Sequence, residues 1–124
     1  MARDGCKMLS MHSAKKLLES VDVILSDCDG VLWTSDAVIP GVPNTIDKLK
    51  AMGKKVFYVT NNSNKSRKDY VQKFLKIGYH VVDDEIFSSA FVTAEYLKTK
   101  RKYQGKVISY TSTATTVRRV GYRK

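Results

Sequence analysis

The stretch Val21-Asp-Val-Ile-Leu-Ser-Asp-Cys-Asp-Gly-Val-Leu-Trp33 decides the fold of this chain. Residues 21–25 are mostly apolar and β-branched, which predicts a buried strand. Asp27 and Asp29 follow one residue apart, and Gly30 comes directly after them. In a parallel α/β sheet, ligands bind just beyond the carboxyl ends of the strands. The pattern therefore predicts two carboxylates that face a pocket, where they can hold a hard cation and act as a nucleophile or as an acid and base.

The totals are those of a small soluble globular protein. The chain has 124 residues, 43% of them hydrophobic, which is enough for one domain with a modest core. No apolar window approaches the length of a membrane span, and no secretory signal is recognisable. Only two cysteines occur, Cys6 and Cys28, so we expect no disulfide framework and a cytoplasmic location. Cys28 is interpreted as a small filler at the strand end, not as a nucleophile.

The net charge of +10 is concentrated at one end of the chain. Residues 1–97 hold 13 Lys and Arg against 12 Asp and Glu, whereas residues 98–124 hold nine Lys and Arg and no acidic residue. Proteins that bind nucleic acid through their fold usually spread basic side chains over a docking face. The distribution indicates a solvated basic end, and a nucleic-acid-binding segment after Lys98 is the least favoured function.

The rest of the chain alternates between helical and strand patterns. The expected helices are residues 1–20, 44–52, 66–77 and about 85–98, and the further strands are residues 55–60 and 106–110. Ser13 is the expected cap of the first helix, and Asp83 or Asp84 that of the last. Residues 34–43, with two prolines, predict a loop or small hairpin. This order predicts an α/β fold, a partial Rossmann-like parallel sheet with flanking helices. From residue 111 the pattern fails, which predicts a disordered or poorly packed basic tail.

A second polar motif follows the strand at residues 55–60. Thr60-Asn61-Asn62-Ser63 begins at the end of that strand, about 30 residues after Asp27. A hydroxyl and main-chain N–H groups at a strand's carboxyl end are suited to binding phosphoryl oxygens. Taken alone, the motif is also compatible with a turn and a helix cap. Its distance of one βα unit from Asp27 favours a shared site.

The two motifs together resemble the haloacid dehalogenase (HAD) superfamily, in its p-nitrophenyl phosphatase, phosphoglycolate phosphatase and pyridoxal phosphatase branch. The resemblance implies a Mg²⁺-dependent phosphatase that hydrolyses phosphoric monoesters through an aspartyl-phosphate. It assigns Asp27 as the nucleophile and Asp29 as the general acid and base. It also implies that Mg²⁺ is held by the Asp27 side chain and the Asp29 main-chain carbonyl. Thr60, with Asn61 and Asn62 beside it, matches the segment that binds the transferring phosphate.

The resemblance covers about residues 20–108 and divides the chain into a leader helix (1–20), a partial HAD core (21–110) and a tail (111–124). Family members are longer and continue into a cap domain, a motif with a lysine and a motif with acidic Mg²⁺ ligands. No Asp or Glu follows Glu95, so we expect a chain without cap, truncated or alternatively ended, whose activity is weak or lost. Pyridoxal phosphate, phosphoglycolate and aryl phosphates all stay open as its small phosphorylated substrate.

A non-catalytic interaction module is the second function class that the sequence leaves open. A sheet without its later strands has an exposed edge, and unpaired backbone groups at such an edge favour association. Such a module would pair with a partner through this edge, and a second copy of the chain is one such partner, giving a homo-oligomer.

Overall fold

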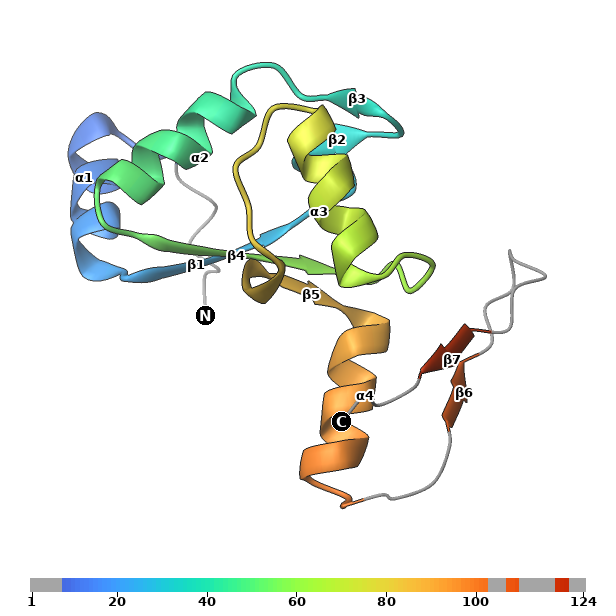
Figure 1. Cartoon of the computed structure of the whole chain (residues 1–124). Helices are drawn as coiled ribbons and strands as arrows, with labels where there is room; N and C mark the ends of the chain where they lie inside the picture. Colours follow the sequence, from blue (N-terminus) through green and yellow to red (C-terminus); the bar gives the residue numbers. More distant parts are fainter. Residues whose placement is uncertain (1–7, 103–106, 110–117, 121–124) are drawn as a thin grey trace, which may run out of the picture.

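The structure, a computed structural model, describes residues 8–102, 107–109 and 118–120 (Figure 1). Its helices are α1 (Met11–Ser20), α2 (Val42–Ala51), α3 (Arg67–Lys76) and α4 (Ser89–Thr99), with a 3₁₀ turn at Asp83–Glu85. Its strands are β1 (Val23–Asp27), β2 (Trp33–Thr34), β3 (Ala37–Val38), β4 (Lys55–Thr60), β5 (Ile86–Ser88), β6 (Val107–Ser109) and β7 (Arg118–Val120). Among these helices, none combines the length and the apolar character that crossing a bilayer requires.

A three-stranded parallel sheet, in the order β1-β4-β5, is the framework of the fold. Asp27 at the end of β1 is paired with Val59, and Thr60 at the end of β4 is paired with Ser88 at the end of β5. Because the strands are parallel, their carboxyl ends meet at one edge. The predicted α/β fold with a parallel sheet is confirmed.

One face of the sheet is covered by helices. Helices α2 and α3 lie on the same side of it in Figure 1. The alternate residues Val56, Tyr58 and Thr60 of β4 are buried on one face, as expected when successive side chains point to opposite faces. Val23 and Leu25 of β1 are 48% and 69% exposed. The edge strand therefore carries apolar side chains that the other described residues cover only in part.

Phe74 of α3 is the centre of an aromatic core. Its ring lies 4.9 Å from that of Trp33, 4.6 Å from that of Tyr58 and 5.5 Å from that of Tyr79, and all four side chains are buried. The Tyr79 hydroxyl also donates a hydrogen bond to the carbonyl of Leu32 at 3.0 Å. These contacts hold helix α3, strand β4 and the β2–β3 hairpin together.

The end of helix α3 supports this cluster. Gly78 has φ of 87°, a left-handed conformation that glycine adopts without a steric penalty. The chain then reverses so that the N–H of Tyr79 donates to the carbonyl of Phe74 at 3.0 Å. Helix α3 thus ends within one residue of the predicted bound at residue 77, and the turn at Gly78 brings the rings of Tyr79 and Phe74 together.

The cap predicted for the first helix is wrong. Ser10, not Ser13, is the N-cap of α1, because its Oγ accepts a hydrogen bond from the N–H of Ser13 at 3.2 Å. An N-cap oxygen bonds the amide two or three residues further on, and Ser13 is here that third amide. No residue of α1 is buried, so the helix is loosely packed.

The helix predicted at residues 85–98 begins later, because a strand comes first. Ile86–Ser88 forms β5, and the caps expected at Asp83 and Asp84 are instead part of the 3₁₀ turn. Ser88 is the actual N-cap of α4, and its Oγ accepts from the N–H of Phe91 at 3.3 Å. A strand of three residues is too short to show an alternating pattern, so the helical periodicity after it dominated the prediction.

The strand predicted at residues 106–110 forms, but not in the main sheet. Strand β6 pairs antiparallel with β7, where no strand was predicted. An apolar run indicates a strand without indicating its partner, and the place beside β4 is taken by β5. The remainder of the tail at residues 111–124 lies outside the described residues, so its disorder stays a prediction.

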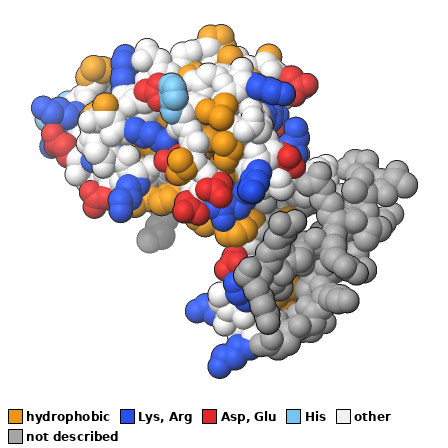
Figure 2. Space-filling view, in the orientation of Figure 1, with side chains coloured by type: hydrophobic (Ala, Val, Ile, Leu, Met, Phe, Trp, Pro, Cys, Tyr) orange, Lys and Arg blue, Asp and Glu red, His pale blue; other side chains and the backbone are white. Residues whose placement is uncertain are grey.

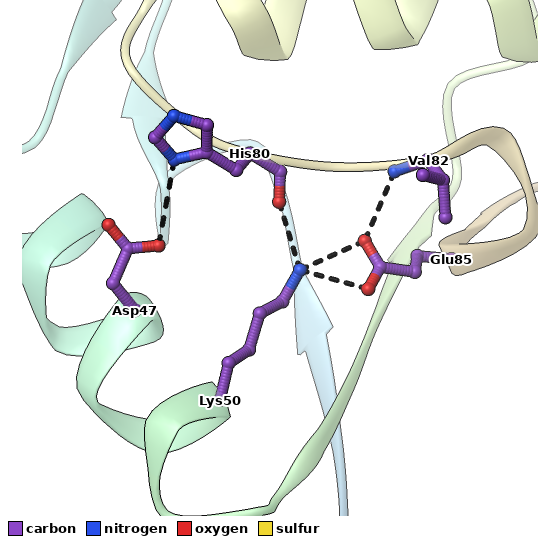
Figure 3. A network of polar contacts seen from close by, with 5 residues as sticks. All are labelled: Asp47, Lys50, His80, Val82 and Glu85. Atoms are coloured by element: carbon purple, nitrogen blue, oxygen red, sulfur yellow. Dashed lines mark hydrogen bonds and ion pairs between the residues drawn. The ribbon is translucent and has the colours of Figure 1, made fainter.

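A network of ion pairs and hydrogen bonds fixes the amino end of β5 (Figure 3). Lys50 Nζ donates to both carboxylate oxygens of Glu85 and to the carbonyl of His80, each at 2.9 Å. Glu85 also accepts from the N–H of Val82 at 3.2 Å, and the His80 Nδ1 atom lies 3.9 Å from Asp47 Oδ1. The network joins α2 to the segment that enters β5, so it is structural and lies at the end of that strand away from Ser88.

We expect replacement of Phe74 by alanine to lower the free energy of unfolding by about 3–5 kcal/mol, since it removes the centre of the aromatic core. Leu75 is the matched control on the same helix, because its side chain is 49% exposed. Leu75→Ala should change stability by less than about 1 kcal/mol. Urea unfolding followed by circular dichroism measures both, and equal losses would contradict the packing described.

Candidate active site

The two polar motifs meet at the carboxyl edge of the sheet. Asp27 is the last residue of β1 and Thr60 is the last residue of β4, one position beyond the partner of Asp27. The buried Tyr70 of α3 lies near both motifs. Burial raises the pKa of its phenol, the Thr60 side chain opposes this through a hydrogen bond, and the charge of Asp29 raises the pKa further. The Tyr70 hydroxyl also donates to the Asn62 carbonyl at 3.4 Å, which ties α3 to the second motif.

A tight loop follows the first strand and turns the chain back on itself. Gly30 has φ of 82°, and its N–H donates to the carbonyl of Trp33 at 2.7 Å. The N–H of Leu32 donates to the carbonyl of Cys28 at 2.8 Å. Gly30 makes this sharp turn without the steric penalty that a side chain would carry at a positive φ. Both aspartates are held at the base of this loop.

Each of the two carboxylates has one oxygen bound and one oxygen free. Asp27 Oδ1 accepts from the N–H of Cys28, and Asp29 Oδ1 accepts from the indole N–H of Trp33, both at 2.7 Å. Within the described ranges, neither Oδ2 atom has a hydrogen-bond partner. Trp33 ends the stretch that carries the two aspartates. It is fully buried, and it also contacts Asp29.

Cys28 is not equipped to be a nucleophile. Its side chain is fully buried, and burial raises the pKa of the thiol to about 12, with further contributions from the negative charges of Asp27 and Asp29. The positive charge of Lys73 only partly opposes these effects. A thiol with such a pKa is protonated at neutral pH, and only the thiolate is a strong nucleophile. The residue fills space between the two carboxylates.

The phosphate-binding segment predicted at residues 60–62 is folded by its own hydrogen bonds. Thr60 is buried, and its Oγ1 accepts from the N–H of Asn62 at 3.1 Å. The Asn62 side chain accepts from the N–H of Asn64 at 2.8 Å, and the Asn61 carbonyl accepts from Ser89 Oγ at 2.8 Å. These bonds fix the backbone directly after the strand, where a phosphate would be bound.

Ser88 and Ser89 are the polar residues of this edge that the sequence analysis missed. The buried Ser88 ends β5 beside Thr60, and Ser89 holds the Asn61 carbonyl. A Ser-Ser pair directly after Ile-Phe is the same signal as a threonine directly after an apolar strand. It was hidden by the helical pattern that follows.

Arg67, which follows the second motif, is not part of the site. Its Nη2 atom lies 2.6 Å from Asp84 Oδ1, its Nε donates to the Asp83 carbonyl at 2.7 Å, and its guanidinium lies 4.2 Å from the ring centre of Phe91. These contacts tie the start of α3 to the chain around β5. The guanidinium charge of Arg67 therefore stabilises the fold through these contacts.

The donor set suits a magnesium ion. Among the described residues no cluster of three or more His, Cys, Asp or Glu side chains is present. Mg²⁺ does not require one, because it is usually bound by one or two carboxylates, by water and by the phosphate of the substrate. Asp27 Oδ2 is unpartnered within the described part, and so is the main-chain carbonyl of Asp29. The Asp29 carbonyl and Oδ1 of Asp27, which has a second lone pair beside its bond to the Cys28 N–H, could hold the ion and leave Asp27 Oδ2 to the phosphoryl group.

Known proteins with similar sequences belong to one family of hydrolases. The model of the family described as Haloacid dehalogenase-like hydrolase matches residues 24–123. Phosphoglycolate phosphatase 2 of Arabidopsis thaliana is 48% identical over 93 residues, which are 74% of this chain and 31% of that protein. Human glycerol-3-phosphate phosphatase is 40% identical over 98 residues, covering 75% of this chain and 30% of that one.

Solved structures show the same relationship. The 4-nitrophenylphosphatase of Thermotoga maritima matches with a TM-score of 0.63 and 31% identity over 68% of this chain and 32% of its own. The chain thus spans about a quarter to a third of the length of the curated relatives that it matches. Since the family model covers most of the sequence, the chain belongs to the haloacid dehalogenase-like hydrolases.

Proposed function

We propose that this site performs Mg²⁺-dependent hydrolysis of phosphoric monoesters. The observation that carries the proposal is the pair of free carboxylate oxygens on Asp27 and Asp29, at the strand ends where Thr60 lies. In this proposal Asp27 is the nucleophile, Asp29 is the general acid and base, and Thr60 binds the phosphate. The named relatives include phosphatases, which supports the same chemistry.

Two steps follow from these assignments. Asp27 Oδ2 attacks phosphorus in line with the leaving oxygen and forms an aspartyl-phosphate, while Asp29 Oδ2 gives a proton to that leaving oxygen. Asp29 then takes a proton from water, which attacks phosphorus and restores the Asp27 carboxylate. The Thr60 hydroxyl and the Asn61 amide donate hydrogen bonds to the equatorial oxygens. When bound, Mg²⁺ supplies neutralisation of the phosphate charge.

We further propose that these 124 residues alone catalyse the reaction weakly or not at all. No acidic residue follows Glu95, and no segment matches the lysine and acidic motifs of the family. Loss of one group that stabilises charge in a transition state typically costs about 10²–10³-fold in rate. The two strand-end motifs would supply binding and the nucleophile without the full electrostatic stabilisation.

The substrate class that we propose is a small phosphorylated metabolite. The relatives named for phosphoglycolate, glycerol-3-phosphate and 4-nitrophenyl phosphate make these esters the first to test, with pyridoxal phosphate implied by the family resemblance. Cys28 is a free thiol, which agrees with the cytoplasmic setting that we propose.

An assay with p-nitrophenyl phosphate and Mg²⁺ tests this proposal. We expect the 124-residue chain to hydrolyse this ester far more slowly than full-length relatives do. Asp27→Asn should remove the residual turnover, by about 10²-fold or more, because the amide cannot form the phosphoryl intermediate. Cys28→Ala is the matched control and should keep turnover within a few fold. Turnover that survives Asp27→Asn, or that is lost in Cys28→Ala, contradicts the proposed nucleophile. Turnover near that of full-length relatives contradicts the proposed weakness.

The free edge of β1 favours a second candidate function, association through the sheet. β1 is an outer strand, its Leu25 is 69% exposed, and Figure 2 shows hydrophobic side chains along the underside of the core. Unpaired backbone groups and apolar side chains at one edge are what a second strand can cover. We propose that a second copy of the chain pairs there.

Light scattering tests this association. The wild-type chain should be a dimer, and Leu25→Lys should be a monomer, because a lysine on an edge strand opposes strand pairing. Leu17 is 51% exposed and belongs to helix α1, not to the strand, so Leu17→Lys should remain a dimer. A monomeric wild type would rule out this candidate.

A further inference from the structure

Trp33 is joined to the site by a direct hydrogen bond. It is the single tryptophan of the chain, its side chain is fully buried, and its indole N–H donates to Asp29 Oδ1 at 2.7 Å. We propose that Trp33 is a positioning residue for Asp29, which holds Oδ1 so that Oδ2 is the oxygen that faces the reacting phosphoryl group. The inference rests on the proposed function for the role of Asp29, while the contact itself stands on the geometry.

The loop fixes both ends of this hydrogen bond. Asp29 and Trp33 form a parallel β-bridge, closed by the N–H of Gly30 on the Trp33 carbonyl at 2.7 Å. The indole ring cannot turn away, because Phe74 packs against it edge-on with ring centres 4.9 Å apart and an interplanar angle of 81°. A donor held this firmly selects one conformation of the carboxylate that it contacts.

Lys73 of α3 adds a charge to the same arrangement. Its ammonium lies 4.4 Å from the centre of the Trp33 ring, in the range of a cation–π interaction. It also donates to the Ser35 carbonyl at 3.2 Å and lies 3.9 Å from Asp36, both in the β2–β3 turn. A cation on the face of an indole attracts its π electrons, which makes the N–H a better donor to an anionic acceptor. Helix α3 thereby supports Asp29 through Trp33.

This hydrogen bond makes the two carboxylate oxygens of Asp29 chemically different. Oδ1 is occupied by the indole N–H, so the proton that Asp29 transfers is carried on Oδ2. Without the indole, the side chain can rotate among several conformations, only one of which points Oδ2 at the leaving oxygen. A misplacement of about 1 Å in a catalytic group can cost about 10²-fold in rate. A loss of about 10- to 100-fold is therefore expected from removing the N–H.

The hydrogen bond can be tested in the free chain by NMR. Because the chain has one tryptophan, its spectrum has one indole N–H signal, which needs no further assignment. Asp29→Ala should move this signal upfield and speed its exchange with water, since the anionic acceptor is lost. Asp27→Ala is the matched control and should leave the signal in place. An indole signal that Asp29→Ala does not change would overturn the proposal.

The positioning role is tested by Trp33→Phe, which keeps an aromatic ring in the core and removes the donor. In the wild type, the Hα–Hβ couplings of Asp29 should show a single rotamer, and in Trp33→Phe they should be averaged. Tyr79→Phe is the matched control: it removes another buried hydrogen bond of this loop, to the Leu32 carbonyl, but keeps the indole N–H and Phe74, so it should retain the single rotamer. A single Asp29 rotamer in Trp33→Phe overturns the proposal. No substrate is present, so these results are independent of whether the chain is a phosphatase.

A kinetic comparison separates this role from a merely structural one. A poor leaving group needs the proton of Asp29 more than p-nitrophenolate does. Trp33→Phe should therefore reduce hydrolysis of glycerol-3-phosphate by a larger factor than hydrolysis of p-nitrophenyl phosphate. Equal losses on the two esters would contradict a role in directing proton transfer.

Discussion

Parallel pairing between β1 and β4 brings together two parts of the chain that are far apart in sequence. It sets the end of one strand beside the end of the other, so that Asp27 and Thr60 share an edge although the β2–β3 hairpin and helix α2 lie between them in the chain. A shift of the register by one residue would turn the side chains of β1 to the opposite face. The chemistry proposed for the site therefore depends on this backbone register.

The aromatic core around Phe74 also helps to position the strand-end residues. Trp33 belongs to that core and also donates a hydrogen bond to Asp29. The packing of the core therefore determines the orientation of the Asp29 carboxylate. Tyr70 similarly lies between the core and Thr60. Thr60 is buried, whereas Asp27 and Asp29 are exposed. Their other oxygens remain available for a ligand.

Sequence predicted the parts of the fold whose signals are local and strong. The strand predicted at residues 55–60 forms with those bounds, and the helix predicted at residues 66–77 forms as α3, one residue shorter at each end. The position of Asp27 and Thr60 at the carboxyl edge of the sheet also followed from the sequence, because each comes at the end of a strand of the parallel sheet.

Features that depend on tertiary contacts were not predictable in this way. Strand β5 has three residues, too few to compete with the helical pattern after it, and the partner of β6 is chosen by which edge is already occupied. The contact between Trp33 and Asp29 depends on the closure of a six-residue loop and on packing against Phe74. Neither is visible in the spacing of the two residues.

The most direct test of a shared phosphate site is a titration of the ¹⁵N-labelled chain with Mg²⁺ and orthovanadate, a phosphate analogue, followed by amide NMR. We predict that the signals of residues 27–33 and 60–62 shift together, with one common dependence on ligand concentration. The amides around Lys50 and Glu85, which lie at the amino end of β5, should not move. Shifts confined to one of the two motifs, or shifts at the Lys50 and Glu85 network alone, would contradict a site built from both strand ends.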